Sequence, residues 1–183
     1  MKKVLVVLTD GFEEIEAITP IDVLRRAGCE VLVAGLAKKV VTGSHGLLIT
    51  TDVLLKEVKE LPDAIVLPGG PGAEDLGRST IVREWILRMN GAKKIVGAIC
   101  AAPAAVLAPT GILEGKKATC FPGYENRLSL GGALVSSERV VTDGEIITSR
   151  GAGTAMEFSL ELARKLAGPE KAAEVSETIL ARA

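Results

Sequence analysis

The sequence predicts an α/β protein built on a doubly wound, mainly parallel β-sheet with helices on both faces. Short runs rich in valine and isoleucine alternate with longer stretches whose apolar residues recur at helical spacing. The short runs are apolar at successive positions, which is typical of strands buried on both faces of a parallel sheet. No repeat, linker or low-complexity segment separates these elements, so we expect one domain over residues 1–183.

The expected strands and helices alternate in chain order. The strands are residues 3–8, 30–34, 64–67, 94–99 and 146–149, and the helices are residues 13–27, 80–89, 103–107 and 154–166. Residues 40–51 indicate a small hairpin, because Gly43 and Gly46 lie near their middle. Residues 118–141 are expected to form irregular strands and turns beside the main sheet.

Two local signals mark helix starts in the last third of the chain. Thr154 followed three residues later by Glu157 predicts a capping box at the start of the helix over 154–166. Pro169 suits the first turn of a final helix over residues 170–182. Both signals agree with helices that follow the last strand of the sheet.

Composition excludes several classes of function. The 22 basic and 23 acidic side chains nearly cancel and form no basic stripe, so we expect no nucleic-acid partner. The start MKKVLVVLTDGFEE imitates a signal peptide, but Asp10 and the glutamates after it interrupt the apolar run too early. No apolar run approaches the roughly 20 residues that span a bilayer, so no membrane partner is expected. Three distant cysteines form neither a disulfide framework nor a zinc site, which favours reduced thiols in the cytoplasm.

Ligands of such a sheet bind at the carboxyl ends of the strands, which here are followed by three informative loops. These loops are TDGFEEIE after the first strand, LPGGPGAEDLG after the third and ICAAP after the fourth. The glycine-rich loop misses the GxGxxG spacing, and no GK[ST] follows it, so the nucleotide patterns fail. Gly69 and Gly70 instead allow the backbone to approach a neighbouring group and direct an N–H toward it.

Cys100 lies where the fourth strand meets a helix. A side chain on such a sharp turn projects into the cleft, and the free N–H groups near Ala101 point at any anion there. Cysteine pKa falls at helix N-termini, so this position favours a reactive thiolate over a small packing residue. We expect Cys29 to be a packing residue, whereas Cys120 is either another packing residue or a resolving thiol near the cleft.

A nucleophilic thiol needs a proton partner, and the sequence offers no local histidine. The single histidine, His45, lies in the expected hairpin. Glu13, Glu14 and Glu16 open the first helix, where carboxylates also complement the helix dipole. A carboxyl that faced an apolar cleft would have a raised pKa and could exchange a proton with the thiol. Helical spacing alone allows either Glu13 or Glu16 in this role.

Four blocks of the sequence together resemble the ThiJ/PfpI superfamily, and specifically its parkinsonism-protein (DJ-one) branch. The blocks are LTDGFEEIEAITPIDVLRRAG, IVLPGGPGAEDL, IVGAICAAPAAVLA and ITSRGAGTAMEF, in this order and covering essentially the whole chain. The resemblance implies a flavodoxin-like fold of the class I glutamine amidotransferase-like type, usually as a homodimer. It also implies that Cys100 is the nucleophile, that Glu16 is its protonated partner, and that the N–H groups of Gly70 and Ala101 line an oxyanion pocket.

The sequence departs from the superfamily pattern at two positions. The protease-like branch has a histidine directly after the cysteine, where this chain has Ala101, so a peptidase is not expected. Other members have a histidine where this chain has Phe121. His45 is a candidate substitute for it, and Arg25 and Arg26 are candidates for holding anions, with surface salt bridges as the alternative.

The resemblance implies a glyoxalase that works without glutathione, or a deglycase that acts on methylglyoxal adducts, and it requires no metal or organic cofactor. Cys100 would add to the aldehyde of a small α-oxoaldehyde, and Glu16 would move a proton between the adjacent carbons. The alternative is a redox sensor or chaperone-like protein in which Cys100 is oxidised to the sulfinate without substantial turnover.

Overall fold

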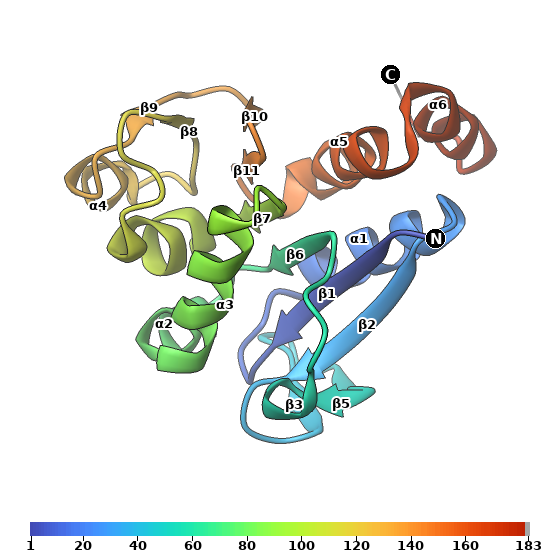
Figure 1. Cartoon of the computed structure of the whole chain (residues 1–183), viewed down its shortest axis with the longest axis horizontal. Coiled ribbons are helices and arrows are strands. Elements are labelled where there is room, and N and C mark those ends of the chain that lie inside the picture. Colours follow the sequence, from blue (N-terminus) through green and yellow to red (C-terminus); the bar gives the residue numbers. More distant parts are fainter. Residues whose placement is uncertain (182–183) are drawn as a thin grey trace.

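The computed structural model describes residues 1–181, which are organised around a seven-stranded sheet (Figure 1). The strands lie in the order β10-β11-β7-β6-β1-β2-β5. Their bounds are β1 (Lys3–Leu8), β2 (Glu30–Gly35), β5 (Val53–Leu54), β6 (Ala64–Leu67), β7 (Ile95–Ile99), β10 (Val140–Asp143) and β11 (Ile146–Ser149). Only the pairing of β10 with β11 is antiparallel within this sheet. The predicted mainly parallel α/β fold is confirmed.

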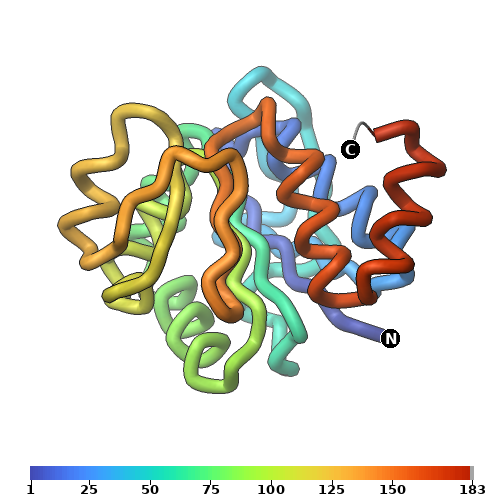
Figure 2. Tube along the Cα trace, turned by 90° about the horizontal axis from the view of Figure 1, so that it is seen from above, coloured from blue at the N-terminus to red at the C-terminus, as the bar shows by residue number. Residues whose placement is uncertain are grey.

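Helices cover both faces of the sheet (Figures 1 and 2). One face carries α1 (Glu14–Arg26), α5 (Ala155–Ala167) and α6 (Pro169–Thr178), and the other carries α2 (Ala73–Arg78) and α3 (Thr80–Gly91). Alternate residues of β1 enter the two cores, with Val4 and Val6 on the α1 side and Leu5 and Val7 on the α3 side. Burial on both sides explains why this strand is apolar at successive positions.

The five expected strands form with bounds that differ by at most one residue from those predicted. The hairpin is also confirmed: β3 (Val40–Thr42) pairs antiparallel with β4 (Leu48–Thr50). Pro169 is the first residue of α6, as predicted, but α6 ends at Thr178, and the predicted terminus at residue 182 lies outside the described residues. Residues Pro103–Leu107 are helical with π-type hydrogen bonding.

Two short helices escaped the sequence analysis, and one capping prediction was wrong. Within residues 118–141, expected to be irregular strands and turns, the chain forms α4 (Glu125–Leu130), and the glycine-rich loop leads directly into α2. β8 (Lys117–Ala118) and β9 (Leu134–Val135) form a separate small sheet. Thr154 precedes α5 without a side-chain capping bond, because its hydroxyl bonds Ser149 and Gly151 instead, while Glu157 pairs with Arg139.

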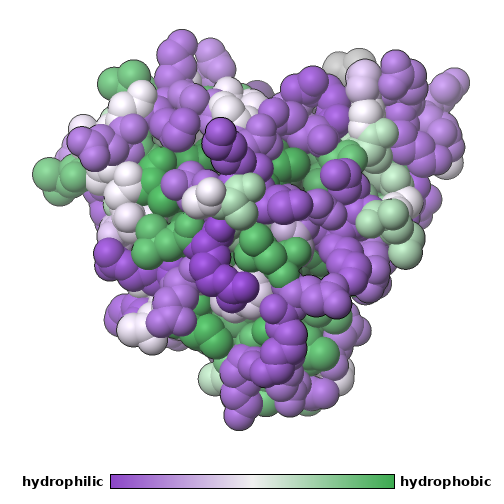
Figure 3. All heavy atoms as spheres, in the orientation of Figure 1, coloured by the Kyte–Doolittle hydropathy of each residue, from purple (hydrophilic) through white to green (hydrophobic). Residues whose placement is uncertain are grey.

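The face shown in Figure 3 is largely polar, and its apolar residues form separate patches. None of the helices within residues 1–181 combines the length and the apolar character needed to cross a membrane.

Candidate active site

The candidate site lies where the sheet order reverses, at the carboxyl ends of β1, β6 and β7. From β1 the chain continues to β2 on one side of the sheet centre, and from β6 it continues to β7 on the opposite side. The boundary between β1 and β6 is therefore a switch point, where α/β sheets commonly bind ligands. The Glu13 N–H donates to the Gly69 carbonyl at 3.1 Å, and the Gly72 N–H donates to the Gly11 carbonyl at 2.9 Å. These bonds hold the loops after β1 and β6 together.

Gly70 permits this close approach of the two loops. Its φ angle is +81°, and a Cβ atom there would lie 2.5 Å from the Gly11 carbonyl oxygen and 2.7 Å from the Glu13 nitrogen. Only glycine meets both the conformational and the steric demand without strain. The glycine-rich loop therefore acts through its backbone, as the sequence analysis expected.

Cys100 follows β7 directly and has a φ angle of +65°, a conformation that non-glycine residues rarely adopt. Its N–H donates to the Ser149 carbonyl at 2.9 Å, and its carbonyl accepts from the Phe121 N–H at 2.8 Å. These two bonds from neighbouring segments hold the turn in its left-handed conformation. Strain of this kind at a strand-to-helix turn is typical of a nucleophile presented to a cleft.

Two backbone groups and one carboxyl surround the Cys100 sulfur. The N–H groups of Gly70 and Ala101 donate toward it, and the Glu16 carboxyl reaches it from the first turn of α1. The Glu16 residue is 0% exposed, and its Oε2 accepts from the Gly69 N–H at 2.8 Å. Among the described residues, its Oε1 has no fixed hydrogen-bond partner. The Glu16 carboxyl therefore keeps one buried oxygen that could carry a proton.

The electrostatics of this pair differ from the sequence expectation. Burial raises the pKa of Glu16 to about 7, although hydrogen bonds with Cys100 and Gly69 act in the opposite direction. Burial and, second, the charge of Glu16 raise the pKa of Cys100 to about 12. Hydrogen bonds from the Gly70 and Ala101 N–H groups lower it, but by less. The expectation of a depressed thiol pKa considered the helix N-terminus and omitted burial and the facing carboxylate.

The two groups consequently titrate as one unit. The pair holds two protons in acid and a single proton above pH about 7. When that proton lies on Glu16, Cys100 is a thiolate that accepts hydrogen bonds from two peptide N–H groups. Glu16 has the lower pKa of the two groups, so the remaining proton lies mainly on Cys100, and its transfer to Glu16 would produce the thiolate without a histidine.

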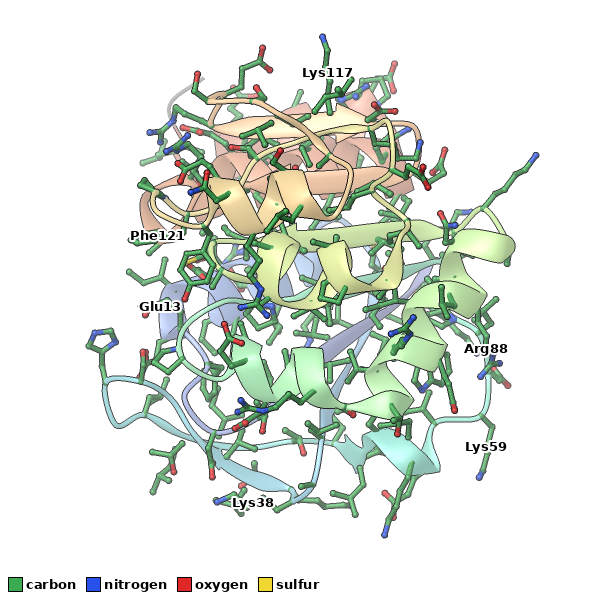
Figure 4. All side chains as sticks on the ribbon, turned by 90° about the vertical axis from the view of Figure 1, so that its left-hand side faces the viewer. Glu13, Lys38, Lys59, Arg88, Lys117 and Phe121 are labelled. Atoms are coloured by element: carbon green, nitrogen blue, oxygen red, sulfur yellow. The ribbon has the colours of Figure 1, made fainter. Side chains whose placement is uncertain are left out.

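The pair opens into a cavity of about 500 Å³. The residues that line it are Glu13, Glu16, Gly70, Pro71, Cys100, Ala101, Phe121, Tyr124 and Ala152. Phe121 is 45% exposed, and it lies close to Glu13 at one edge of the view in Figure 4. Phe121 therefore belongs to the cavity wall, although its side chain cannot transfer a proton.

His45 does not join the Cys100 pair. Its side chain is 73% exposed, and its Nδ1 lies 2.9 Å from a Glu14 oxygen and 3.6 Å from a Glu13 oxygen. The hydrogen bond with Glu14, together with the negative charges of Glu13 and Glu14, raises the pKa of His45. These three residues are the one group within residues 1–181 whose donor atoms could hold a metal ion, but Glu14 already accepts hydrogen bonds from the backbone of His45 and Leu47.

The other accessory candidates also lie apart from the thiol. Arg26 pairs with Asp22 at 2.8 Å on the exposed face of α1, which is the surface salt bridge given as the alternative. Arg25 donates to the Val31 carbonyl at 3.3 Å. Cys120 is 1% exposed and Cys29 is 7% exposed, and both are free. Burial raises the pKa of both thiols, which fits packing roles.

Sequence reasoning anticipated that Gly69 directs its N–H toward a neighbouring group but did not identify Glu16 as that group, and it missed Tyr124. Gly69 holds the Glu16 carboxyl by its N–H, and a Cβ there would lie 2.6 Å from the Cys100 Cβ. The doubled glycine of the PGGPG segment was the available signal for this close packing. Tyr124 lines the cavity from the turn before α4, and no spacing rule connects it with Cys100.

The fold and the Cys100–Glu16 pair define a class of α/β proteins that present a cysteine on a nucleophile turn. Residues 2–165 match the model of the DJ-1/PfpI family. The chain belongs to this family.

Named relatives agree with this assignment. The chain is 43% identical to the Parkinson disease protein 7 homolog of Danio rerio, over 98% of this chain and 97% of that protein. It is 38% identical to the glutathione-independent glyoxalase DJR-1.2 of Caenorhabditis elegans, over 93% and 91% of the two chains. It is also 42% identical to protein DJ-1 homolog A of Arabidopsis thaliana over 99% of this chain, and it spans only 47% of that longer relative.

Solved structures show the same fold. The crystal structure of Drosophila melanogaster DJ-1beta has a TM-score of 0.94 at 40% identity and covers 100% of this chain and 99% of that one. A structure of Toxoplasma gondii DJ-1, described as oxidized, has a TM-score of 0.93 at 36% identity and covers 98% of both chains.

Proposed function

We propose that this protein is a cysteine-dependent glyoxalase that converts methylglyoxal to lactate without glutathione. The observation that carries the proposal is the buried Glu16 carboxyl beside the Cys100 thiol, with one oxygen unpartnered among the described residues. The glyoxalase named in Caenorhabditis elegans supports it through similarity along the chain. Early adducts of methylglyoxal are a second substrate class, because they release the same aldehyde when they break down. The protein would therefore protect against carbonyl stress.

The chemistry begins when the Cys100 thiolate attacks the aldehyde carbon and forms a C–S bond. The new oxyanion accepts hydrogen bonds from the Gly70 and Ala101 N–H groups, and Glu16 supplies its proton. Glu16, now a carboxylate, removes the proton from the former aldehyde carbon to give an enediolate. The hydroxyl proton on that carbon moves to the neighbouring oxygen, and Glu16 returns its proton to the adjacent carbon, which leaves a thioester. Water then cleaves the resulting thioester, which releases lactate and regenerates the thiol.

The test is glutathione-free conversion of methylglyoxal to lactate by the wild type, Cys100→Ser and Glu16→Gln. We expect both variants to lose turnover while circular dichroism shows an intact fold. Cys29→Ala is the matched control, because Cys29 is buried away from the cavity. Retained turnover in Cys100→Ser would overturn the proposal.

A second candidate function is redox sensing with a chaperone-like protective role. The Gly70 and Ala101 N–H groups and the Glu16 carboxyl would bind the oxyanion of the glyoxalase reaction. The same groups could form hydrogen bonds with the oxygens of a Cys100 sulfinate. The oxidized Toxoplasma gondii relative favours this candidate. Mass spectrometry after mild peroxide separates the two functions. Addition of two oxygens at Cys100 with negligible turnover supports the sensor, and equal oxidation at Cys29 contradicts it.

We also propose that the protein is a cytoplasmic homodimer. Exposed apolar side chains gather on α1 and on the adjoining β3–β4 hairpin, and they are Ile15, Ile18, Val40, Leu47 and Leu48. The hairpin joins the start of α1 through the Ser44 N–H, which donates to the Phe12 carbonyl at 2.8 Å. A second copy of the chain would remove this apolar surface from water. The three free cysteines support a reducing compartment.

A further inference from the structure

The turn of the β3–β4 hairpin packs against the start of α1 and brings three possible metal ligands together. The Ser44 N–H donates to the Phe12 carbonyl at 2.8 Å, which fixes the hairpin beside the helix. As a result, carboxylate oxygens of Glu13 and Glu14 and a ring nitrogen of His45 all lie within 4.8 Å of one another. The ligands come from two segments that are distant in the sequence, so an ion held by all three would tie the hairpin to the helix.

The spacing of these atoms suits a single small ion. His45 Nδ1 lies 2.9 Å from Glu14 Oε2 and 3.6 Å from Glu13 Oε1. In a tetrahedral zinc site, metal–ligand bonds of about 2.0–2.1 Å separate neighbouring ligand atoms by about 3.3 Å. The two measured distances lie on either side of this value. A metal ion would take the place of the proton between His45 and Glu14, and small side-chain rotations would complete its coordination.

The Glu14 carboxylate is already oriented for this role. Its Oε1 accepts hydrogen bonds from the His45 N–H at 2.7 Å and from the Leu47 N–H at 3.4 Å, which leaves Oε2 directed at the imidazole. Gly43 provides the space for this carboxylate, because an added Cβ there would clash with it. Hydrogen bonds to the second oxygen of a ligating carboxylate are the usual means of orienting it.

Charge and ligand type indicate which class of ion would bind. Within residues 1–181, His45 is the single basic side chain that pairs with Glu13 or Glu14, so two carboxylates face at most one positive charge. A divalent cation would balance both carboxylates. An imidazole nitrogen combined with carboxylates favours zinc and similar transition metals over magnesium or calcium, which prefer oxygen ligands alone. The His45 side chain is 73% exposed, which leaves access for the ion and for a water ligand.

We propose that Glu13, Glu14 and His45 form a binding site for one zinc-like divalent cation, with water as the fourth ligand, that fastens the β3–β4 hairpin to α1. The site is separate from the Cys100 thiol, although Glu13 also lines the cavity beside that thiol. No step of the proposed glyoxalase reaction passes through the ion. The inference therefore stands or falls independently of the proposed function, which is tested by turnover of metal-free protein.

The experiment measures the affinity of metal-free protein for Zn²⁺ by calorimetry. We expect one ion per chain, and we expect His45→Asn and Glu14→Gln each to weaken binding at least tenfold. The exposed His45 can be replaced without disturbing the core, and asparagine can still donate to Glu14. Glu138→Gln is the matched control, because it removes one exposed carboxylate outside the hairpin and should leave the affinity unchanged.

Co²⁺ absorption identifies the ligands, because thiolate coordination adds an intense charge-transfer band that nitrogen and oxygen ligands do not give. We expect no such band, and we expect the same spectrum in Cys100→Ser. Zn²⁺ should also slow amide hydrogen exchange over residues 40–50 in the wild type and not in His45→Asn. Absence of binding, binding insensitive to His45→Asn, or binding lost in Cys100→Ser would overturn the inference.

Discussion

The Glu16 carboxyl and the Cys100 thiol face each other in the interior and share protons as one unit. Residues from separate elements create this relationship, since Glu16 belongs to α1 and Cys100 follows β7. Burial raises the pKa of both groups, to about 7 for Glu16 and about 12 for Cys100. The position of the remaining proton therefore decides whether the site holds a neutral thiol or a thiolate.

The pH dependence of turnover should report this pair. In the wild type, kcat/KM for methylglyoxal should rise with pH through about 7, because the first proton must leave before a thiolate can form. Glu16→Gln should remove that step, move the rise to higher pH and lower kcat/KM at neutral pH roughly a hundred-fold or more. Steady-state kinetics across pH check this. An unchanged profile in Glu16→Gln would assign the titration to another group.

Stability should depend on pH through the same carboxyl, with a defined sign. The folded-state pKa of Glu16 is raised above its ordinary value of 4.5. The stability contributed by its protonated form is therefore fully present in acid and is lost as pH rises from about 4.5 to about 7. The loss is up to about 3 kcal/mol. Relative to Glu16→Gln, the wild type should become less stable between pH about 5 and about 8.

Urea unfolding of both proteins at the two pH values measures that difference. The comparison cancels groups common to the two proteins. Glutamine keeps an oxygen that can accept from the Gly69 N–H, so the variant retains the bond that holds this side chain. A stability difference that is constant with pH would show that Glu16 has an ordinary pKa in the folded protein.

Gly69→Ala should disrupt the pair through steric contact. The added Cβ would lie 2.6 Å from the Cys100 Cβ and 2.7 Å from Glu16 Oε2, so one of these groups must move. We expect a loss of about 1–3 kcal/mol in the free energy of unfolding and at least a tenfold loss of turnover. Gly91→Ala is the control, because a Cβ there meets nothing within 4 Å. Equal effects of the two substitutions would contradict this role for Gly69.

The proposed homodimer can be tested at the hairpin. Leu48 is 66% exposed in the apolar patch, and Leu48→Glu would place a charge in the proposed interface. We expect light scattering to show a dimer for the wild type and a monomer for this variant. Leu130→Glu, which changes an 89% exposed leucine of α4, should remain dimeric. A monomeric wild type, or a dimeric Leu48→Glu, would place the interface elsewhere or remove it.

The strands could be predicted because their signal is local. Residues such as Val4, Leu5, Val6 and Val7 are all apolar, and the two opposing cores that bury them require this composition. Short helices were harder to recognise, because α2 and α4 have only six residues each and begin in loops with turn-forming residues. The predicted capping box failed because the Thr154 hydroxyl found a buried partner in Ser149, which adjoins it only in the folded structure.

The sequence by itself determined the order of the elements, the loops that meet at the carboxyl edge of the sheet, and the turn that presents Cys100. These features follow from apolar spacing and from glycine positions, which act over a few residues. Only the tertiary structure decided the proton chemistry, because the raised pKa values of Glu16 and Cys100 arise from burial and from charges distant in the chain. It likewise separated His45 from the thiol and joined Phe121 and Tyr124 to the cavity, since packing between elements sets which side chains share a space.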